Sequence, residues 1–175
     1  MTAWDAVRTK RAVREFADRP IPPELLDRIV RAGTRAHSSK NQQRWAFVVV
    51  QDRQRLQALS KVGPYAGHIA GAAAAIALVT PDPRSDGEPL SVTWDLGGAA
   101  AQMMLVAWED GIGSCPATVY EQELARELLG YPADRWCEYI LSFGYPADLA
   151  KLTAPLKSGG RRPMDDVVHH ERWGG

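Results

Sequence analysis

The segment from Ser91 to Asp110 constrains the fold more than any other part of the chain. Its apolar residues recur at helical spacing on one face, and the opposite face is also largely apolar. A helix that is apolar nearly all round is buried in a large core or at a subunit interface. The run of alanines from 99 to 101 permits close approach of a neighbouring helix. This pattern alone leaves a large core and a dimer interface open as alternatives.

Composition limits the class of protein. The chain has 175 residues, so one domain covering residues 1–175 is the default. Lys+Arg and Asp+Glu both number 21, and a net charge of zero gives no global field for nucleic acid or an anionic membrane surface. The N-terminus lacks the pattern of a signal peptide, and the apolar run from Ile69 to Val79 is too short to cross a bilayer. We therefore expect a cytoplasmic protein with no nucleic-acid or membrane partner.

The two cysteines, Cys115 and Cys137, are far apart and form no C-x-x-C motif. This spacing predicts neither a disulfide framework nor a metal site, and both residues are expected in the core. The adjacent pair His169-His170 is interpreted as part of a solvated or packed tail rather than as a metal site. The sequence thus offers no metal centre.

Helical and strand patterns alternate along the chain, which favours an α+β or α/β class. Helices are predicted at 2–10, from Pro22-Pro23-Glu24 to before Ser38, at 53–59 and at 121–129. Strands are predicted at 47–50 and 73–79, both buried on two faces, and at 137–143, half-buried by its alternation. A G-x-G-x-x-G motif after the first strand is missing, which argues against a Rossmann-type nicotinamide domain.

The polar tail from 147 to 175 cannot form a core of its own, so it has to lie across the body or across a partner. It carries the cation pair Arg161-Arg162. A second cation cluster, formed by Lys10, Arg11 and Arg14, lies near the N-terminus. Such a cluster is either a solvated charged face or, through the donor fork of arginine, an anion site. Two clusters could converge on one phosphate.

Ser38, Ser39 and Asn41 lie at a junction between a helix and a strand, where they either cap and turn the chain or contact a ligand. The run Gly111-Ile112-Gly113-Ser114-Cys115-Pro116 is either a helix stop or a place where backbone N–H groups approach a flat ligand. Each motif alone is ambiguous.

Taken in order, the motifs resemble those of the nitroreductase family. Lys10-Arg11-Ala12-Val13-Arg14-Glu15-Phe16 resembles R-R-S-[VI]-R-x-F, and residues 36–47 resemble A-P-S-x-x-N-x-Q-P-W-x-F. Residues 95–103 resemble D-x-G-x-A-x-Q-N, and residues 111–115 resemble G-L-G-[ST]-C. Gly144-Tyr145-Pro146 and residues 161–169 resemble the closing blocks of the family.

The resemblance implies an α+β sandwich with a central mixed β-sheet flanked by helices. It also implies a homodimer with FMN sites at the interface and a C-terminal extension (residues 147–175) that wraps the partner subunit. Lys10, Arg11 and Arg161, with Arg162 beside them, would hold the FMN phosphate. Arg14 would meet the N1/C2-carbonyl edge of the flavin, where a cation stabilises the charge that develops on reduction.

The remaining implied contacts come from both subunits. Ser38, Ser39 and Asn41 would come from the second subunit, and the backbone around Ala117 and Thr118 would approach flavin N5. The chain departs from the family pattern at some of these positions. Ala12 stands in place of a serine, which removes a hydroxyl contact, and His37 stands in place of a proline. Further departures are Lys10 for arginine, Arg44 for proline and Met103 for asparagine.

The implied activity is that of an FMN-dependent oxidoreductase. It would take hydride from NAD(P)H and reduce nitroaromatics, quinones or activated alkenes by a ping-pong mechanism. The flavin carries the chemistry, so no catalytic side chain is required, and His37 is a candidate contact to substrate or nicotinamide. Two alternatives remain: the same fold used for reductive dehalogenation or dehydrogenation, and a flavin-binding module without turnover.

Overall fold

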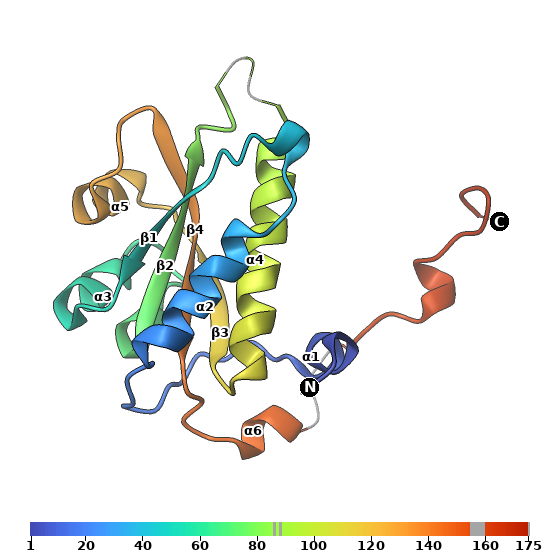
Figure 1. The fold of residues 1–175 in the computed structure, drawn as a ribbon, viewed down its shortest axis with the longest axis horizontal. Helices are drawn as coiled ribbons and strands as arrows, with labels where there is room; N and C mark the ends of the chain where they lie inside the picture. Colours follow the sequence, from blue (N-terminus) through green and yellow to red (C-terminus); the bar gives the residue numbers. More distant parts are fainter. Residues whose placement is uncertain (86, 88, 155–159, 175) are drawn as a thin grey trace.

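A four-stranded antiparallel sheet forms the middle layer of the molecule, with helices on both faces (Figure 1). The computed structural model describes residues 1–85, 87, 89–154 and 160–174. The strand order is β1-β2-β4-β3. The strands are β1 (Ala46–Val50), β2 (Ala74–Pro81), β3 (Gly113–Thr118) and β4 (Arg135–Gly144). The α+β class expected from the sequence is confirmed.

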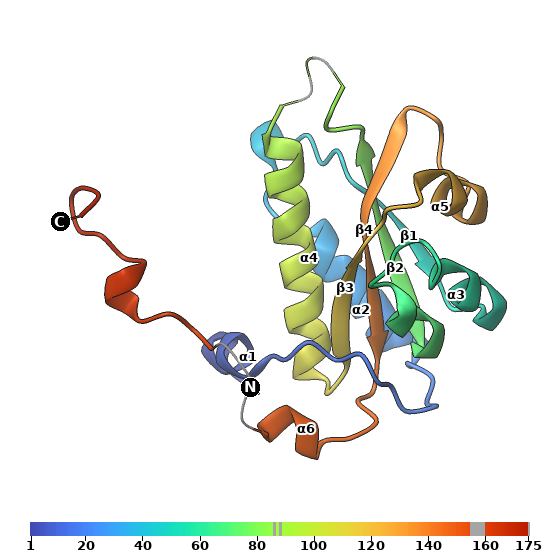
Figure 2. The same ribbon diagram turned by 180° about the vertical axis from the view of Figure 1, so that it is seen from behind.

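Two hydrophobic clusters cover the two faces of the sheet. Helices α2 (Pro23–Thr34) and α4 (Ser91–Glu109) pack on one face, and their core includes Ile29, Met103 and Phe143. Helices α3 (Arg53–Leu59) and α5 (Gln122–Leu129), with the 3-10 turn η2 (Gly67–Gly71), cover the other. Figures 1 and 2 show these two layers from opposite sides.

Helix α4 is buried against the sheet through residues that recur at helical spacing, and it packs closely on α2. On the other side of α4, Trp94 is 73% exposed. The core of one chain therefore covers only part of the apolar surface of this helix. Helix α1 (Ala3–Thr9) lies against the last turn of α4, where Trp108 Nε1 donates a 3.0 Å hydrogen bond to Thr9 Oγ1. The predicted Thr2 cap of α1 is present, in a reciprocal box with Asp5.

Two predictions about strand burial are wrong. Strand β1 lies at the edge of the sheet and Val49 is 41% exposed, so it is not buried on both faces. Strand β4 is central and buried from Ile140 to Gly144, not half-buried. A register shift between β2 and β4 skips Glu138, so Cys137 faces one cluster while Leu141 faces the other. The alternation read from the sequence therefore does not mark one continuous face.

Strand β3 was not predicted, because Gly113 and Pro116 suggested only a turn. It is an edge strand, the position at which a sheet tolerates proline. The four strands all pair antiparallel, so the expectation of a mixed sheet is not met by them. Among the described residues, the one parallel pairing that is found is the isolated bridge between Ala12 and Ser114.

The tail forms the short helix α6 (Ala150–Thr153) and the turn η3 (Met164–Asp166). In Figures 1 and 2 the part after residue 162 extends away from the sheet and its helices. Its apolar side chains are exposed, with Met164 at 71% and Trp173 at 89%. This last part of the tail therefore does not lie across the body of its own chain. Within the described residues, no helix is both long and apolar enough to span a membrane.

Candidate functional site

The residues from Lys10 to Phe16 form a strap along the open edge of β3. Ala12 bridges Ser114, and the Val13 N–H donates a 3.0 Å hydrogen bond to the Ser114 carbonyl. Val13 is buried against Gly113, where an added Cβ would lie 2.4 Å from Val13 Cγ2. This close approach fixes the strap, so that the side chains on either side of Val13 are held in place by the sheet.

The strap opens into a cleft of about 570 Å³. Of the predicted site residues, Arg11, Ala12 and Arg14 line it. Arg14 is exposed and Arg11 half-buried, so both guanidinium groups can reach a ligand. The far wall is formed by residues of the tail, where Lys151 pairs with Glu15. The cleft thus gathers one predicted cation cluster at a single opening.

The second cation cluster approaches the first at Lys10. Burial lowers the pKa of the Lys10 ammonium; the Cys115 thiol raises it and the nearby charge of Arg161 lowers it. Arg161 is exposed. A half-buried ammonium beside a second cation fits a ligand that carries negative charge, such as a phosphate. Lys10 and Arg161 thus lie close enough for their charges to interact, and the convergence of the two clusters on one phosphate stays a prediction.

Arg162 has a different environment from Arg161. Its Nη2 donates a 2.7 Å hydrogen bond to the backbone carbonyl of Asp166, which folds the tail around η3. The structure thus gives Arg162 a role in shaping the tail and shows no contact between it and the strap.

Ala117 and Thr118 lie on β3, opposite Ile140 and Tyr139. The whole Ala117 residue, backbone included, is 1% exposed, whereas Thr118 is half-buried, so within one chain a ligand can reach Thr118 but not Ala117. Because β3 is an edge strand, one side of its backbone is not covered by another strand. Pro116, one residue earlier, lines a second cleft of about 500 Å³ together with Arg14. Within one chain the predicted backbone approach has access at Thr118 and not at Ala117, and it stays a prediction.

The polar loop lies at the other end of the molecule, around the 3-10 turn η1 (Ser39–Asn41). The Ser39 N–H donates a 2.9 Å hydrogen bond to Oδ2 of Asp95, a buried carboxylate in the second turn of α4. Ser38 Oγ accepts a bond from the Gln43 N–H, and Asn41 Oδ1 accepts one from Gln43 Nε2. These hydrogen bonds turn the chain before β1, which is one of the two roles that the sequence left open for these residues. Ser39 and Asn41 remain exposed.

His37 precedes this loop and pairs with Trp94. The Trp94 indole Nε1 donates a 3.1 Å hydrogen bond to His37 Nε2. The imidazole ring lies over Gly98, where an added Cβ would be 3.4 Å from Cε1. These residues line a third cleft of about 620 Å³, which continues along α4 to Leu90.

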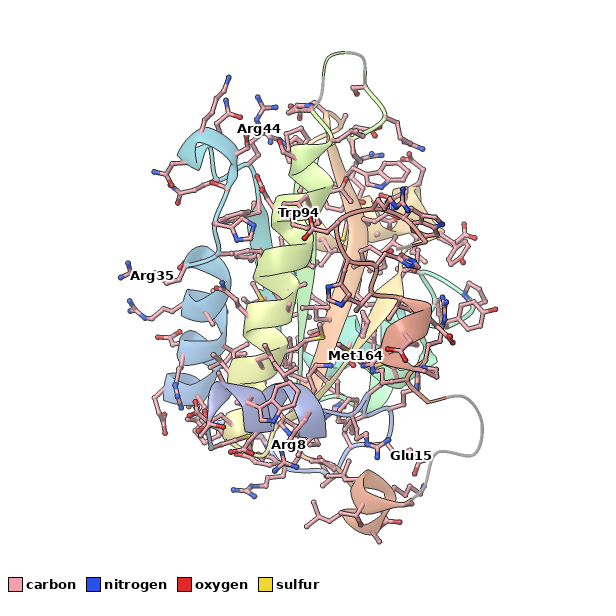
Figure 3. The ribbon with its side chains drawn as sticks, turned by 90° about the vertical axis from the view of Figure 1, so that its right-hand side faces the viewer. Arg8, Glu15, Arg35, Arg44, Trp94 and Met164 are labelled. Carbon is pink, nitrogen blue, oxygen red and sulfur yellow. The ribbon has the colours of Figure 1, made fainter. Side chains whose placement is uncertain are left out.

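The strap and the polar loop do not form one site within a chain. Thr9 is bonded to Trp108 and Ser39 to Asp95, and these partners are 13 helical residues apart on α4. At 1.5 Å per residue this is about 20 Å. Figure 3 shows the same separation, with Arg8 at one end of α4 and Arg44 at the other. One chain therefore places the two predicted groups of site residues at opposite ends of α4.

Sequence reasoning missed two residues of this region. Asp95 was noted as part of a motif but given no role, and it anchors the polar loop. His68 was not considered; it lines the second cleft beside Arg14 and bonds to Ser142, 74 residues away. Neither contact has a local signal, because both join segments that only the folded chain brings together.

The cysteines are core residues, as expected. Burial raises the pKa of the Cys115 thiol, against the nearby charges of Arg14 and Lys10, and burial raises that of Cys137 to about 12. Both are free thiols. Over the described residues, no three His, Cys, Asp or Glu side chains are grouped so as to hold a metal ion.

Comparison with known proteins agrees with this geometry. The profile of the nitroreductase family matches residues 7–70 and 61–145. A relative from Archaeoglobus fulgidus, which bears a provisional NADH dehydrogenase/NAD(P)H nitroreductase name, is 33% identical over 173 residues, covering 95% of this chain and 96% of its own. The chain belongs to the nitroreductase family, and it is an oxidoreductase.

Two further similarities are informative. The solved structure of an FMN-dependent nitroreductase from Clostridium difficile R20291 has a TM-score of 0.78 and 26% identity, covering 95% of this chain and 98% of that one. A segment of 45 residues is 47% identical to an iodotyrosine deiodinase from Haliscomenobacter hydrossis, covering 26% of this chain and 20% of that one. The first similarity spans the fold, and the second a single segment.

Proposed function

We propose that the protein is a homodimeric, FMN-dependent oxidoreductase that takes hydride from NAD(P)H. It passes the electrons to nitroaromatics, quinones or activated alkenes in a ping-pong cycle. The observation that carries this proposal is the approach of Arg161 to Lys10 beside the cleft that Arg11 and Arg14 line. Within the described part of the chain, Arg11 and Arg14 form no ion pair, and such cations at an open cleft fit the phosphate and the electron-rich ring edge of FMN.

The chain's own residues divide the work of binding. Lys10, Arg11 and Arg161 hold the phosphate, with Arg162 shaping the tail that presents Arg161. Ala12 offers no hydroxyl, so its contribution is limited to backbone contact. Bound FMN supplies the ring that accepts hydride and releases electrons.

Arg14 is placed to act on charge rather than on the phosphate. It lines both the cleft of the strap and the cleft beside Pro116, so it can face a ligand that extends from one to the other. A fixed cation at a position where negative charge develops stabilises the charged state more than the neutral one. Arg14 would therefore favour reduction, while the backbone of Ala117 and Thr118 orients the ring.

A second copy of the chain completes the site. Ser38, Ser39 and Asn41 lie about 20 Å along α4 from the strap, so they cannot serve the same ligand in one chain. The exposed apolar side of α4 supports pairing of two subunits in which each supplies its polar loop to the other. The extended tail would then wrap the partner, which gives its exposed apolar side chains a surface to cover.

NAD(P)H as reductant is supported by the name of the Archaeoglobus relative and FMN by that of the Clostridium structure. The two free, buried thiols suit a reducing cytoplasm. The experiment is to load purified protein with FMN, add NADH or NADPH without oxygen, and follow the visible flavin absorbance. Bleaching, followed by recovery when a quinone or nitroaromatic is added, is the expected result.

Two rivals are separated by the same experiment. The short match to an iodotyrosine deiodinase favours reductive dehalogenation as a second candidate activity, and recovery of the absorbance with an iodinated phenol in place of a quinone would support it. A protein that binds FMN but is not bleached by either nicotinamide would be a flavin-binding module. A protein that binds no FMN would overturn the proposal.

A further inference from the structure

One ring nitrogen of His68 is bonded to a serine hydroxyl, and the other has a different environment. Its Nδ1 lies 2.8 Å from Ser142 Oγ, and Ser142 Oγ donates a 3.2 Å hydrogen bond to the carbonyl of Cys115. A serine hydroxyl has one proton, which is used in the bond to Cys115. With Ser142 donating to Cys115, Nδ1 of His68 carries a proton and donates it to Ser142. In the neutral ring this leaves Nε2 as a bare acceptor.

Nε2 of His68 is buried and, among the described residues, has no hydrogen-bond partner. A buried polar atom without a partner is uncommon and calls for an explanation. Protonation would turn it into a donor, and the backbone carbonyl of Pro116 favours that form. Burial and the charge of Arg14 oppose it and lower the pKa of His68. Burial and Arg14 thus favour the neutral ring, and the Pro116 carbonyl favours the protonated ring.

The balance between neutral and protonated His68 depends on the charges around one cleft. His68, Arg14, Tyr65 and Pro116 line the same opening of about 500 Å³. Besides His68, the titratable groups that line it are Arg14 from the strap and Tyr65 from the loop before η2. Cys115 of β3 is buried outside the lining, and its thiol interacts with the charges of Arg14 and Lys10. No carboxylate lines this cleft among the described residues. Arg14 is therefore uncompensated there until a ligand brings negative charge.

We propose that His68 is a proton-accepting residue that responds to negative charge placed in the cleft it shares with Arg14. With Arg14 uncompensated, the ring stays neutral and Nε2 stays bare. When an anionic group faces Arg14, the repulsion on His68 falls, and Nε2 binds one proton from solvent and donates it toward the Pro116 carbonyl.

The identity of the anionic group rests on the proposed function, in which Arg14 meets the ring edge of FMN; Arg14 also lines the cleft of His68, so charge on that edge would act on both residues. Reduction places negative charge there, so His68 would take up a proton each time the protein is reduced and return it on reoxidation. His68 itself is neither oxidised nor reduced, and its role is to balance charge. It is a positioning residue for a proton rather than a group that reacts with substrate.

Two measurements on the FMN-loaded protein test this proposal. The first is the ¹⁵N NMR titration of His68 in the oxidised and the reduced protein. We expect the Nδ1-protonated tautomer when oxidised and an increase of the His68 pKa by at least one unit on reduction, which corresponds to at least a tenfold gain in proton affinity. The second is proton uptake during anaerobic reduction, followed with a pH-indicator dye in weak buffer.

The variant His68→Gln keeps a side chain able to donate to Ser142 and cannot be charged. At a pH between the two His68 pKa values we expect it to take up fewer protons per flavin than wild type, by about half a proton for a shift of one unit and up to one proton for a larger shift. Each whole proton changes the reduction equilibrium tenfold per pH unit, or about 30 mV for a two-electron couple. His170→Gln, in the exposed tail, is the matched control and should behave as wild type. If His68→Gln fails to fold, the NMR titration of wild type still decides the matter.

The outcomes distinguish this inference from the proposed function. FMN binding and reduction with equal proton uptake in wild type and His68→Gln, or a His68 pKa that does not move on reduction, overturns the inference alone. Failure to bind FMN removes the proposed function and the inference with it. Loss of stability in His68→Gln with unchanged proton uptake would show a structural role and also overturn the inference.

Discussion

The indole N–H of Trp94 donates a 3.1 Å hydrogen bond to Nε2 of His37, although the Trp94 side chain is 73% exposed. The bond fixes one edge of the indole and leaves its face open to a cleft beside Leu90 and Gly97. An ordered aromatic face of this kind suits a flat acceptor, because stacking places little demand on further ordering of the side chain.

Replacing Trp94 by phenylalanine tests this pair. We expect Trp94→Phe and His37→Ala each to lower kcat/KM for nitroaromatic acceptors about 3- to 10-fold, the size of one aromatic contact of about 1 kcal/mol. Steady-state kinetics with several acceptors gives the answer. Trp4→Phe, an exposed tryptophan on α1, serves as control. Equal losses with aromatic and non-aromatic acceptors would argue against a stacking role.

The closeness of Lys10 and Arg161 predicts that phosphate stabilises the protein. At ten times its Kd a ligand that binds only the folded state adds about 1.4 kcal/mol, and thermal unfolding would shift upward by about 3 to 5 °C. Lys10→Ala and Arg161→Ala should each reduce this shift by half or more. Sodium chloride at the same ionic strength controls for screening. An equal shift with both salts would leave no specific anion site.

Arg14 is predicted to affect the reduction step more than FMN affinity. Arg14→Ala should slow anaerobic flavin reduction about 10²- to 10³-fold, the usual effect of losing one group that stabilises developing charge. The FMN Kd should change much less, because the phosphate cations remain. Stopped-flow reduction and fluorescence titration separate the two effects, with Arg31→Ala on α2 as control. A large rise in Kd with unchanged reduction rate would assign Arg14 to the phosphate instead.

The helices were predictable because their signals are local. Thr2 and Asp5 cap α1, Pro23 opens α2, and Gly130 ends α5 in a left-handed conformation with φ of 72°, all within a few residues of the helix ends. The predictions of strand burial were wrong where the burial depends on the neighbouring strand in the sheet. Whether residues 47–50 are central or at an edge, and whether Glu138 is skipped in the pairing, depends on β2.

The candidate site also contains residues that have a local signal in the sequence and residues that have none. The cation clusters could be read from the sequence because charge density is a local property, and Lys10 and Arg161 do approach one another. His68 could not, since its bond to Ser142 crosses 74 residues, and the Asp95 anchor of Ser39 crosses 56. An isolated histidine in an Ala/Gly-rich stretch gives no sign of the charge that will face it.

Gly113 is predicted to be intolerant of any side chain. An added Cβ would lie 2.4 to 2.9 Å from three atoms of Val13, whose β-branched side chain is stiff and buried. We expect Gly113→Ala to destabilise the protein by about 1 to 3 kcal/mol, as overpacking does. It should also weaken FMN binding, because the strap would move. Gly71→Ala, where an added Cβ meets nothing within 4 Å, is the control, and urea unfolding with FMN titration is the measurement. Equal stability of the two variants would show that the strap yields freely.

Tyr131 and Cys137 make the core sensitive to alkaline pH. Burial raises the pKa of Tyr131 from 10.0 to about 12 and that of Cys137 from 9.0 to about 12. Both groups are neutral when protonated, so above pH 9 to 10 the unfolded chain loses protons that the folded chain keeps. The free energy of unfolding therefore falls as pH rises toward 12, by about 1.4 kcal/mol per pH unit for each group.

The variant Tyr131→Phe isolates one of these two contributions. It removes a hydroxyl that donates to the Gln122 carbonyl, so it should destabilise by about 1 kcal/mol at neutral pH. Between pH 10 and 12 it should lose stability less steeply than wild type, and the two curves should converge. Denaturant unfolding across this range measures both slopes, with Tyr120→Phe, 57% exposed, as control. Parallel curves for wild type and Tyr131→Phe would mean that Tyr131 ionises in the folded protein as readily as in the unfolded chain.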